Sequence, residues 1–417
     1  MGQVRWAGWA VVFAAAWVLS AGQAFADIAS DKMAALLIYP KIEFDSTAGK
    51  DTVIRLTNTN STQAILVHCF YLDANSHCHG GSNDRGICTN SPAACTGGGI
   101  CRPGWVETDF RINLTAGQPI EWLASEGLAD SNGSAAGSGG GAGGPPGLPL
   151  PRGTCTGNPF FSCGSDADCA RFSAGRCTQS NVGTRIPRVS EDPFVGELKC
   201  IAIDSNGIPV PRNELKGEAI LTEFNGHSAP YDTASYNAIG IQATGASTGA
   251  ANELILGGPD PEYNGCPNYL IMNHFFEEVD RPVPNAPAEI ETSLVVVPCS
   301  EDLLRQIPGA AVLQFLVFNE FEQRFSTSKS VTCYDETRLC NIDTPNCNFS
   351  IFNANVMGTV AGQTRVQAIR SPALDGVPSA VLGIGIERHV GGTETRSAAF
   401  NLHHQGSRAE ADIITIP

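Results

Sequence analysis

The chain has 417 residues, of which 42 are Asp or Glu and 26 are Lys or Arg, so its formal net charge is −16 at pH 7. A chain this acidic repels nucleic acid and anionic lipid surfaces, which excludes polyanion-binding roles. Its length is sufficient for two or three domains.

An export signal is predicted at residues 1–26. Arg5 supplies a short positive segment, residues 10–19 (AVVFAAAWVL) are apolar, and Ala24-Phe25-Ala26 is a small-x-small cleavage site. The apolar segment is short for a bilayer core of roughly 30 Å, and no later segment is apolar for longer. We therefore expect a secreted chain, at the cell surface or in the periplasm, with no transmembrane segment after cleavage.

All 15 cysteines follow this signal. Abundant cysteine in an exported chain favours disulfides, and the absence of any C-x-x-C argues against metal binding by thiolates. We predict that Cys69 and Cys200 bridge two sheets, that Cys299 pairs with Cys333, and that Cys340 and Cys347 close a small loop. The odd count leaves one cysteine unpaired, and we assign it as Cys266.

The other disulfide candidates lie in two insertions. These insertions, residues 74–104 and 129–193, are rich in Gly, Ser and Asn and are too small to form apolar cores of their own. We expect each to be held by two bridges among the following cysteines: Cys78, Cys88, Cys95, Cys101, Cys155, Cys163, Cys169 and Cys177. The Gly/Ser/Pro tract at 129–153 is expected to be flexible.

An internal repeat organises the rest of the chain. Six segments recur in the same order, for example residues 35–40 (ALLIYP) as 293–298 (SLVVVP), and 114–118 (LTAGQ) as 359–363 (TVAGQ). They are short apolar or alternating segments separated by Gly, Asn, Asp and Pro, which is typical of antiparallel strands and turns.

The fold class expected from this repeat is all-β, with two tandem immunoglobulin-like antiparallel β-sandwiches. The first would span residues 27–286 and carry both insertions, and the second would span 287–417. The turn Asp204-Ser205-Asn206-Gly207 suits a positive φ at its end. The best helix candidate is residues 300–307 (SEDLLRQI), with Ser300 as its N-cap.

Two glycine-containing motifs match catalytic or cofactor patterns without the required context. Residues 245–249 (GASTG) fit G-x-S-x-G, which needs a strand, a strained turn and a helix in a parallel sheet. Residues 139–144 (GGGAGG) fit G-x-G-x-x-G, but they lie in a linker-like tract. We assign no catalytic and no cofactor-binding residue, and we expect a non-enzymatic protein.

Two segments contain residues that could ligate a metal. His77-Cys78-His79 could present two imidazoles on one side of a strand, but Cys78 is more simply half of a disulfide. Asp166-Ala167-Asp168 lacks the full D-x-[DN]-x-[DN]-G pattern of a calcium-binding loop. We assign no metal-ligating residue, and calcium remains the alternative. Glu277-Glu278 offers no partner geometry for glycosidase chemistry.

Several segments resemble a group of exported deltaproteobacterial proteins with tandem immunoglobulin-like repeats and no known activity. They include YPKIEFDSTAGKDTVIRLTNTN, ETDFRINLTAGQPIEWLASEGL, GELKCIAIDSNGIPVP and LQFLVFNEFEQRFSTSKSVTCYDE. The resemblance implies lineage and export, and it adds no mechanism.

Three functions fit these features. The first is a structural, adhesive or assembly protein of the cell envelope that contacts a protein or a glycan, since rigid scaffolds commonly carry variable contact loops. The second is a carbohydrate-binding or hydrolytic β-sandwich. The third is a calcium-stabilised surface module. Aromatic residues are only 7% of the chain, which disfavours the second function relative to the first.

Overall fold

The computed structural model describes most of the chain after the predicted export signal. The described residues are 28–89, 91–102, 106–128, 153–155, 158–163, 186–224, 230–245, 252–277, 280–283, 286–369, 379–391 and 394–417. The predicted signal, most of the Gly/Ser/Pro tract and most of the G-x-S-x-G motif lie outside them.

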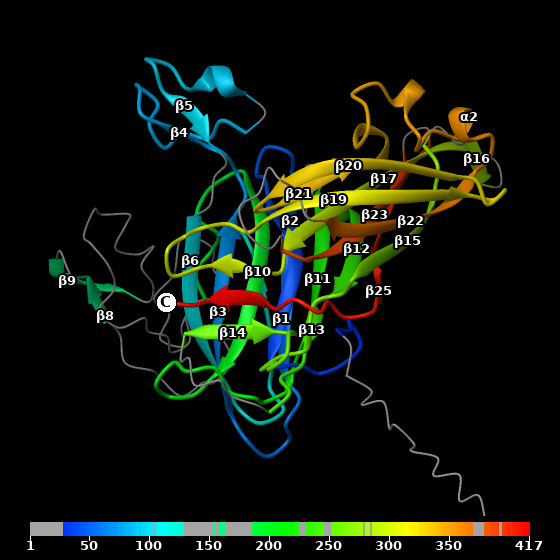
Figure 1. The fold of residues 1–417 in the computed structure, drawn as a ribbon. Coiled ribbons are helices and arrows are strands. Elements are labelled where there is room, and N and C mark those ends of the chain that lie inside the picture. The colour runs from blue at the N-terminus through cyan, green and yellow to red at the C-terminus, as the bar shows by residue number, and fades with distance from the viewer. Residues whose placement is uncertain are drawn as a thin grey trace, which may run out of the picture.

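Strands account for 57% of the structure and helices for 4%, so the predicted all-β class is confirmed. Two sheets come mainly from the N-terminal half (Figure 1). One has the order β13 (Ile239–Ile241), β1 (Leu36–Phe44), β10 (Phe194–Ile203), β3 (Ile65–Asp73) and β6 (Val106–Leu114). The other has the order β12 (Pro230–Asn237), β11 (Leu215–Phe224), β2 (Lys50–Asn58) and β7 (Pro119–Leu123).

Two further sheets come mainly from the C-terminal half. One has the order β20 (Arg324–Thr332), β19 (Ala310–Asn319), β22 (Ala361–Ile369), β15 (Tyr269–Phe275) and β25 (His403–Gln405). The other has the order β16 (Asp280–Val283), β17 (Ala286–Pro298), β23 (Val381–Gly391) and β24 (Glu394–Asn401), with β21 (Asp335–Arg338) also paired to β17.

The smaller elements connect or cap these sheets. A three-stranded sheet joins β14 (Glu253–Leu256), β26 (Asp412–Thr415) and β18 (Glu301–Asp302), in which β18 and β26 run parallel. Two hairpins pair β4 (His77–His79) with β5 (Ile100–Arg102) and β8 (Gly153–Cys155) with β9 (Asn158–Cys163). The described helices are single turns: η1 (Pro92–Ala94), η2 (Leu339–Asn341), η3 (Cys347–Phe349) and α2 (Ala354–Met357).

The inner strands are buried on both of their faces. Val295 and Val297 of β17 belong to one apolar core, and Leu294 and Val296 belong to the next. All described residues of β3 except Leu66 are buried, and Leu36–Ile42 of β1 are buried without interruption. Because successive side chains of a strand point to opposite faces, continuous burial requires a packed layer on each side.

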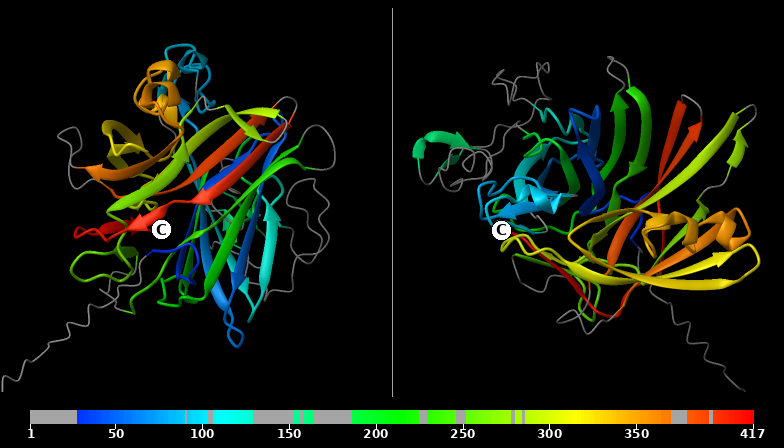
Figure 2. Two further views of the ribbon diagram at one scale, coloured as in Figure 1. Left: turned by 90° about the vertical axis from the view of Figure 1, so that its right-hand side faces the viewer. Right: turned by 90° about the horizontal axis from the view of Figure 1, so that it is seen from above.

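The outer strands alternate instead. In β19 every second side chain is buried, and β7 shows the same alternation. Figure 2 shows the orange and red strands of the C-terminal part lying against the blue and green strands of the N-terminal part. Strand β12 lies beside β24, where the side-chain amide of Asn401 donates to the carbonyl of Asn237 at 2.7 Å.

The prediction of two tandem immunoglobulin-like sandwiches is therefore wrong. The sheets are arranged as a five-bladed β-propeller with small additional sheets. Within it, a single apolar core combines residues of β1, β3 and β10 with residues of β17, β23 and β26. The prediction relied on the alternation of buried and exposed residues in strands such as β19, which indicates a sheet with one exposed face. The continuous apolar segments at 35–40 and 293–298 instead form strands that are buried on both faces. The boundary predicted at residue 287 falls inside β17.

The helix predicted at 300–307 is also absent. Glu301 and Asp302 form β18, followed by a turn, and the Ser300 hydroxyl donates to Asp412 at 2.7 Å instead of capping a helix. The turn at Asp204–Gly207 is present, and Gly207 has a φ of 86°. The Asp204 carboxylate accepts the amides of Asn206 and Ile208 at 2.8 and 2.9 Å, which orders this turn.

The shared core predicts that the N-terminal half does not fold alone. A chain ending at residue 286 would expose the face of β1 that packs toward β17 and β23. We expect residues 28–286 to show no cooperative thermal transition and to bind a hydrophobic dye, whereas residues 28–417 melt cooperatively. A sharp transition in the shorter chain, followed by circular dichroism, would restore an independent N-terminal domain.

Candidate functional site

The structure tests the predicted cysteine pairs directly. Cys69 is bonded to Cys200 as predicted, but the two lie opposite each other on neighbouring strands β3 and β10 of one sheet, so they do not bridge two sheets. The predicted Cys299–Cys333 bond is wrong, because Cys299 is bonded to Cys266. Cys333 is buried and unpaired, so among the described cysteines it is the odd one in place of Cys266.

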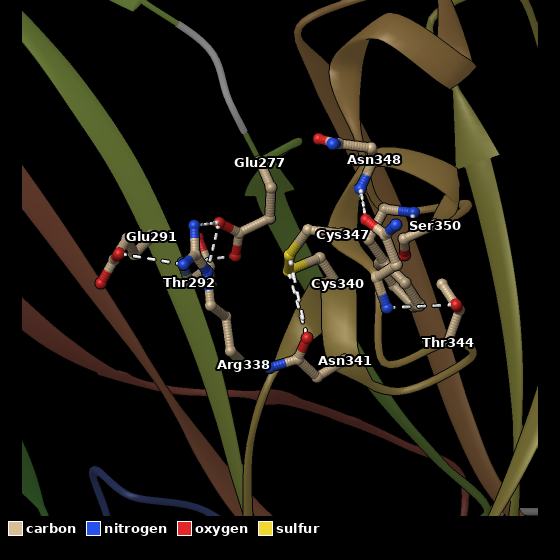
Figure 3. Close-up of a disulfide and its surroundings, with 12 residues drawn as sticks. Glu277, Glu291, Thr292, Arg338, Cys340, Asn341, Thr344, Cys347, Asn348 and Ser350 are labelled. Carbon is tan, nitrogen blue, oxygen red and sulfur yellow. Dashed lines mark hydrogen bonds and ion pairs between the residues drawn. A yellow bond between two sulfur atoms is a disulfide. The ribbon is translucent and has the colours of Figure 1, made fainter.

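The predicted small loop between Cys340 and Cys347 is present (Figure 3). Beside this disulfide, the buried carboxylate of Glu277 accepts hydrogen bonds from Arg338 Nε and from the Thr292 amide, both at 2.9 Å. Glu291 lies 3.0 Å from the same guanidinium. Glu277 is thus held in an ion pair with Arg338.

The first insertion is held by two disulfides, Cys78–Cys95 and Cys88–Cys101. These cysteines form a small buried cluster separate from the main core. Figure 1 shows the β4–β5 hairpin of this insertion standing away from the sheets. The side chains of Cys155, Cys163, Cys169 and Cys177, and the Asp166–Asp168 segment, lie outside the described residues.

Three potential metal ligands meet at the base of this insertion. Asp73 ends β3, His77 begins β4, and Glu191 precedes β10; their ligand atoms lie within 4.8 Å of one another. His77 Nε2 is 3.0 Å from a Glu191 oxygen. The Asn75 side-chain amide donates to Glu191 at 2.7 Å, and its backbone amide donates to Asp73 at 2.8 Å.

The two carboxyl groups of this cluster titrate differently. Burial, with the Glu191 carboxylate beside it, raises the pKa of Asp73 to about 9. Burial also acts to raise the pKa of Glu191, but hydrogen bonds from His77, Asp73 and Asn75 outweigh it and lower that pKa. The arrangement therefore holds one proton between two carboxyl groups. Two carboxylates and an imidazole would also suit Zn²⁺ or Mn²⁺.

Sequence reasoning found only one member of this cluster. His77 was considered together with Cys78 and His79, but Cys78 is in a disulfide and His79 is exposed. The spacing between Asp73, which directly precedes the first insertion, and His77 was the available signal. Glu191 comes from the end of the second insertion, and only the fold brings it to the other two.

A groove of about 630 Å³ lies over strands β15, β19 and β22. Its floor contains a cross-strand row in which Asn273, Gln363 and Phe318 are register partners. The Gln363 amide donates to Asn273 at 3.2 Å, and the Arg365 guanidinium lies 5.9 Å from the centre of the Phe318 ring. The remaining polar lining includes Glu320, Glu322 and Glu387.

The lining of this groove combines polar and apolar side chains. Side chains that point out of β19 are half-buried, whereas those between them are in the core. Below the floor, His274 is buried, its Nε2 lies 2.8 Å from the Thr364 hydroxyl, and burial lowers its pKa to about 4. His274 is thus a neutral core residue, while Arg365, the amides and the carboxylates face the groove.

The pKa of Asp73 predicts a pH-dependent stability. Its carboxyl holds a proton up to about pH 9 when folded, but only up to about pH 3.8, the ordinary pKa of an aspartate, when unfolded. The folded state therefore binds more protons between these values, and the free energy of unfolding falls as pH rises across this window. At pH 8 we expect Asp73→Asn to be more stable than the wild type by about 1–3 kcal/mol, measured by urea denaturation.

The exposed residue Asp31 supplies the matched control, because Asp31→Asn should leave the pH dependence unchanged. Zn²⁺ or Mn²⁺ added at pH 8 should raise the melting temperature of the wild type and leave that of Asp73→Asn unchanged, if the cluster binds a cation. A wild type with flat stability from pH 5 to 8 would contradict the assigned protonation.

No family model, curated protein or solved structure matches this chain. Among the described residues, no helix is long and apolar enough to cross a bilayer.

Proposed function

We propose that this protein is a non-enzymatic exported protein of the cell envelope with a structural or adhesive role. The proposal rests on one combination of features. The β-sheets outside the first insertion, here called the body, are linked by disulfides, and the first insertion stands away from them. Among the residues that the structure describes, three disulfides lie in the body, and two hold residues 78–101. Disulfides of this number are typical of compartments outside the reducing cytoplasm.

The first insertion is built as a rigid projection. Its cysteine cluster is independent of the main core, and its glycines at 80, 81, 97 and 98 have positive φ values that suit tight turns. Ile100 is 61% exposed at the start of β5. A loop fixed by its own bridges presents such side chains to a partner with little loss of conformational entropy.

The test replaces this projection while leaving the body intact. In a variant with residues 80–99 replaced by a short Gly-Ser turn, and with Cys78→Ser and Cys101→Ser, the main core keeps all its residues. We expect the wild type to be biotinylated on intact producing cells and to sediment with the envelope. The variant should keep its circular dichroism spectrum and move to the soluble fraction.

Phe349→Ser, on the exposed η3 turn, is the control for a surface change elsewhere and should stay with the envelope. A wild type that is released as a free monomer, with no labelled partner, would contradict the structural or adhesive role.

A second candidate function is carbohydrate binding in the groove over β15, β19 and β22. The groove combines the half-buried rings of Phe275 and Phe318 with amide, guanidinium and carboxylate groups. Rings offer apolar faces for the C–H surfaces of a sugar, and planar polar groups can bond pairs of hydroxyls. Neutral or amino sugars fit this lining better than acidic ones, because three glutamates face it.

Glycan-array screening followed by calorimetry tests this second candidate. We expect Arg365→Ala to weaken binding by about tenfold or more, because a hydrogen bond from a charged group contributes about 1.5–3 kcal/mol. Arg324→Ala, at the exposed start of β20 in the same sheet, is the matched control and should bind as the wild type does. An array with no hit, or equal losses in both variants, would contradict a sugar site in this groove.

A further inference from the structure

A lysine and two glutamates are fully enclosed in the main core. The side chains of Lys199, Glu301 and Glu197 are 0%, 0% and 1% exposed, respectively. Lys199 Nζ donates to Glu301 Oε2, and it lies 2.8 Å from Glu197 Oε2. Glu197 and Lys199 are on the same face of β10, whereas Glu301 comes from β18, about a hundred residues further along the chain.

The surroundings of this cluster are apolar. Lys199 lies on the central strand of its sheet, between its register partners Ile38 of β1 and Phe70 of β3, which are both fully buried. Lys199 Nζ lies 2.8 Å from a Glu197 carboxylate oxygen, and the Glu301 carboxyl is hydrogen-bonded to Glu197 as well. The charges of all three groups act electrostatically on the buried thiol of Cys333.

Burial determines which of the three side chains in the cluster are protonated. It raises the pKa of Glu301 well above its usual range, and the neighbouring Glu197 carboxylate raises it further. Burial acts to lower the pKa of Lys199, but the two carboxylates outweigh it and raise that pKa. The favoured state is therefore an ammonium, one carboxylate and one carboxylic acid, with no net charge.

We propose that Lys199 Nζ and Glu301 Cδ join in an intramolecular amide bond, with Glu197 as the proton acceptor. The Glu197 carboxylate takes a proton from the Lys199 ammonium, and the freed amine attacks the carbonyl carbon of the Glu301 carboxylic acid. The C–O bond to the acid hydroxyl then breaks, and that hydroxyl leaves as water with a second proton from the same nitrogen. The products are an amide, one water molecule and a neutral Glu197 carboxylic acid, so atoms and charge balance.

The site supplies what this reaction needs. The reacting groups are held in contact by two strands, which removes the entropy loss of bringing them together. Conversion of two buried charges into neutral groups is favoured in an apolar core, where charges are poorly solvated. Glu197 is positioned as a general base against the same nitrogen.

A second lysine cluster in the chain lacks these conditions. Lys41 lies 2.6 Å from Glu336 and 3.2 Å from Glu43, so its composition is the same. The Glu336 side chain is 30% exposed, however, and its pKa is lowered because Lys41 outweighs burial. A solvated carboxylate is a poor acceptor for an amine, so Lys41 remains in an ion pair and serves as the internal control.

The amide would tie β10 to β18 without a sulfur atom. Cys200 follows Lys199 in β10, and Cys299 lies two residues before Glu301; each is in a disulfide. Three covalent links would thus meet near one part of the core. The two disulfides break under reducing conditions, whereas the amide bond would not.

Mass spectrometry of the full exported chain, after reduction and alkylation, tests the proposal. We expect the mass to be lower than that of the unmodified sequence by one water molecule. Trypsin should fail to cleave after Lys199, and a branched peptide should join the segments around Lys199 and Glu301. Glu197→Gln should show the full mass, and Lys41→Met should keep the loss of one water.

Full mass in the folded wild type, with the peptide ending at Lys199 recovered in full yield, would overturn the proposal. Cross-linking in Glu197→Gln at the wild-type level would overturn the role of Glu197. Should that variant fail to fold by circular dichroism, the wild-type mass and the branched peptide still decide whether the bond exists.

Discussion

The burial of the central strands on both faces is the constraint on which the rest of this structure depends. Strand β17 contributes Val295 to one core and Leu294 to the next, so the packing of the two halves is coupled through one strand. The outer strands β7 and β19 need only one buried face, and they keep polar residues on the other. The groove lies on the free face of β19 because that face has no packing partner within the described chain.

The same two-sided burial explains why charged groups in the core come in compensated sets. Lys199 is enclosed with two glutamates, and Glu277 is enclosed with Arg338 and a backbone amide. An isolated buried charge would cost several kcal/mol, so each group is either paired or protonated. The acidic cluster at Asp73 follows the same rule, because one of its two carboxyl groups keeps a proton.

The disulfides divide into two kinds by location. Cys69–Cys200 and Cys266–Cys299 lie in the main core, where packing already holds the strands. Cys78–Cys95 and Cys88–Cys101 replace a core in an insertion that has too few apolar residues to form one. The side chains of Asp73, His77 and Glu191 meet at the base of this insertion, where the projection joins the body.

The sequence by itself determined the strand content, the turn at Asp204–Gly207 and the disulfides Cys69–Cys200 and Cys340–Cys347. Local signals suffice for the strands, the turn and the Cys340–Cys347 loop, since alternation, turn residues and short loop spacing act between near neighbours. The Cys69–Cys200 pair spans 131 residues, and it was predicted from an immunoglobulin-like arrangement that the structure does not have. Only the tertiary structure decided the rest. Cys299 pairs with Cys266 and not Cys333, Glu301 lies in a strand and not a helix, and Glu191 meets His77. Each of these three outcomes depends on how the sheets pack against one another. Side-chain alternation specifies the buried face of a strand, but it does not specify the layer that covers that face.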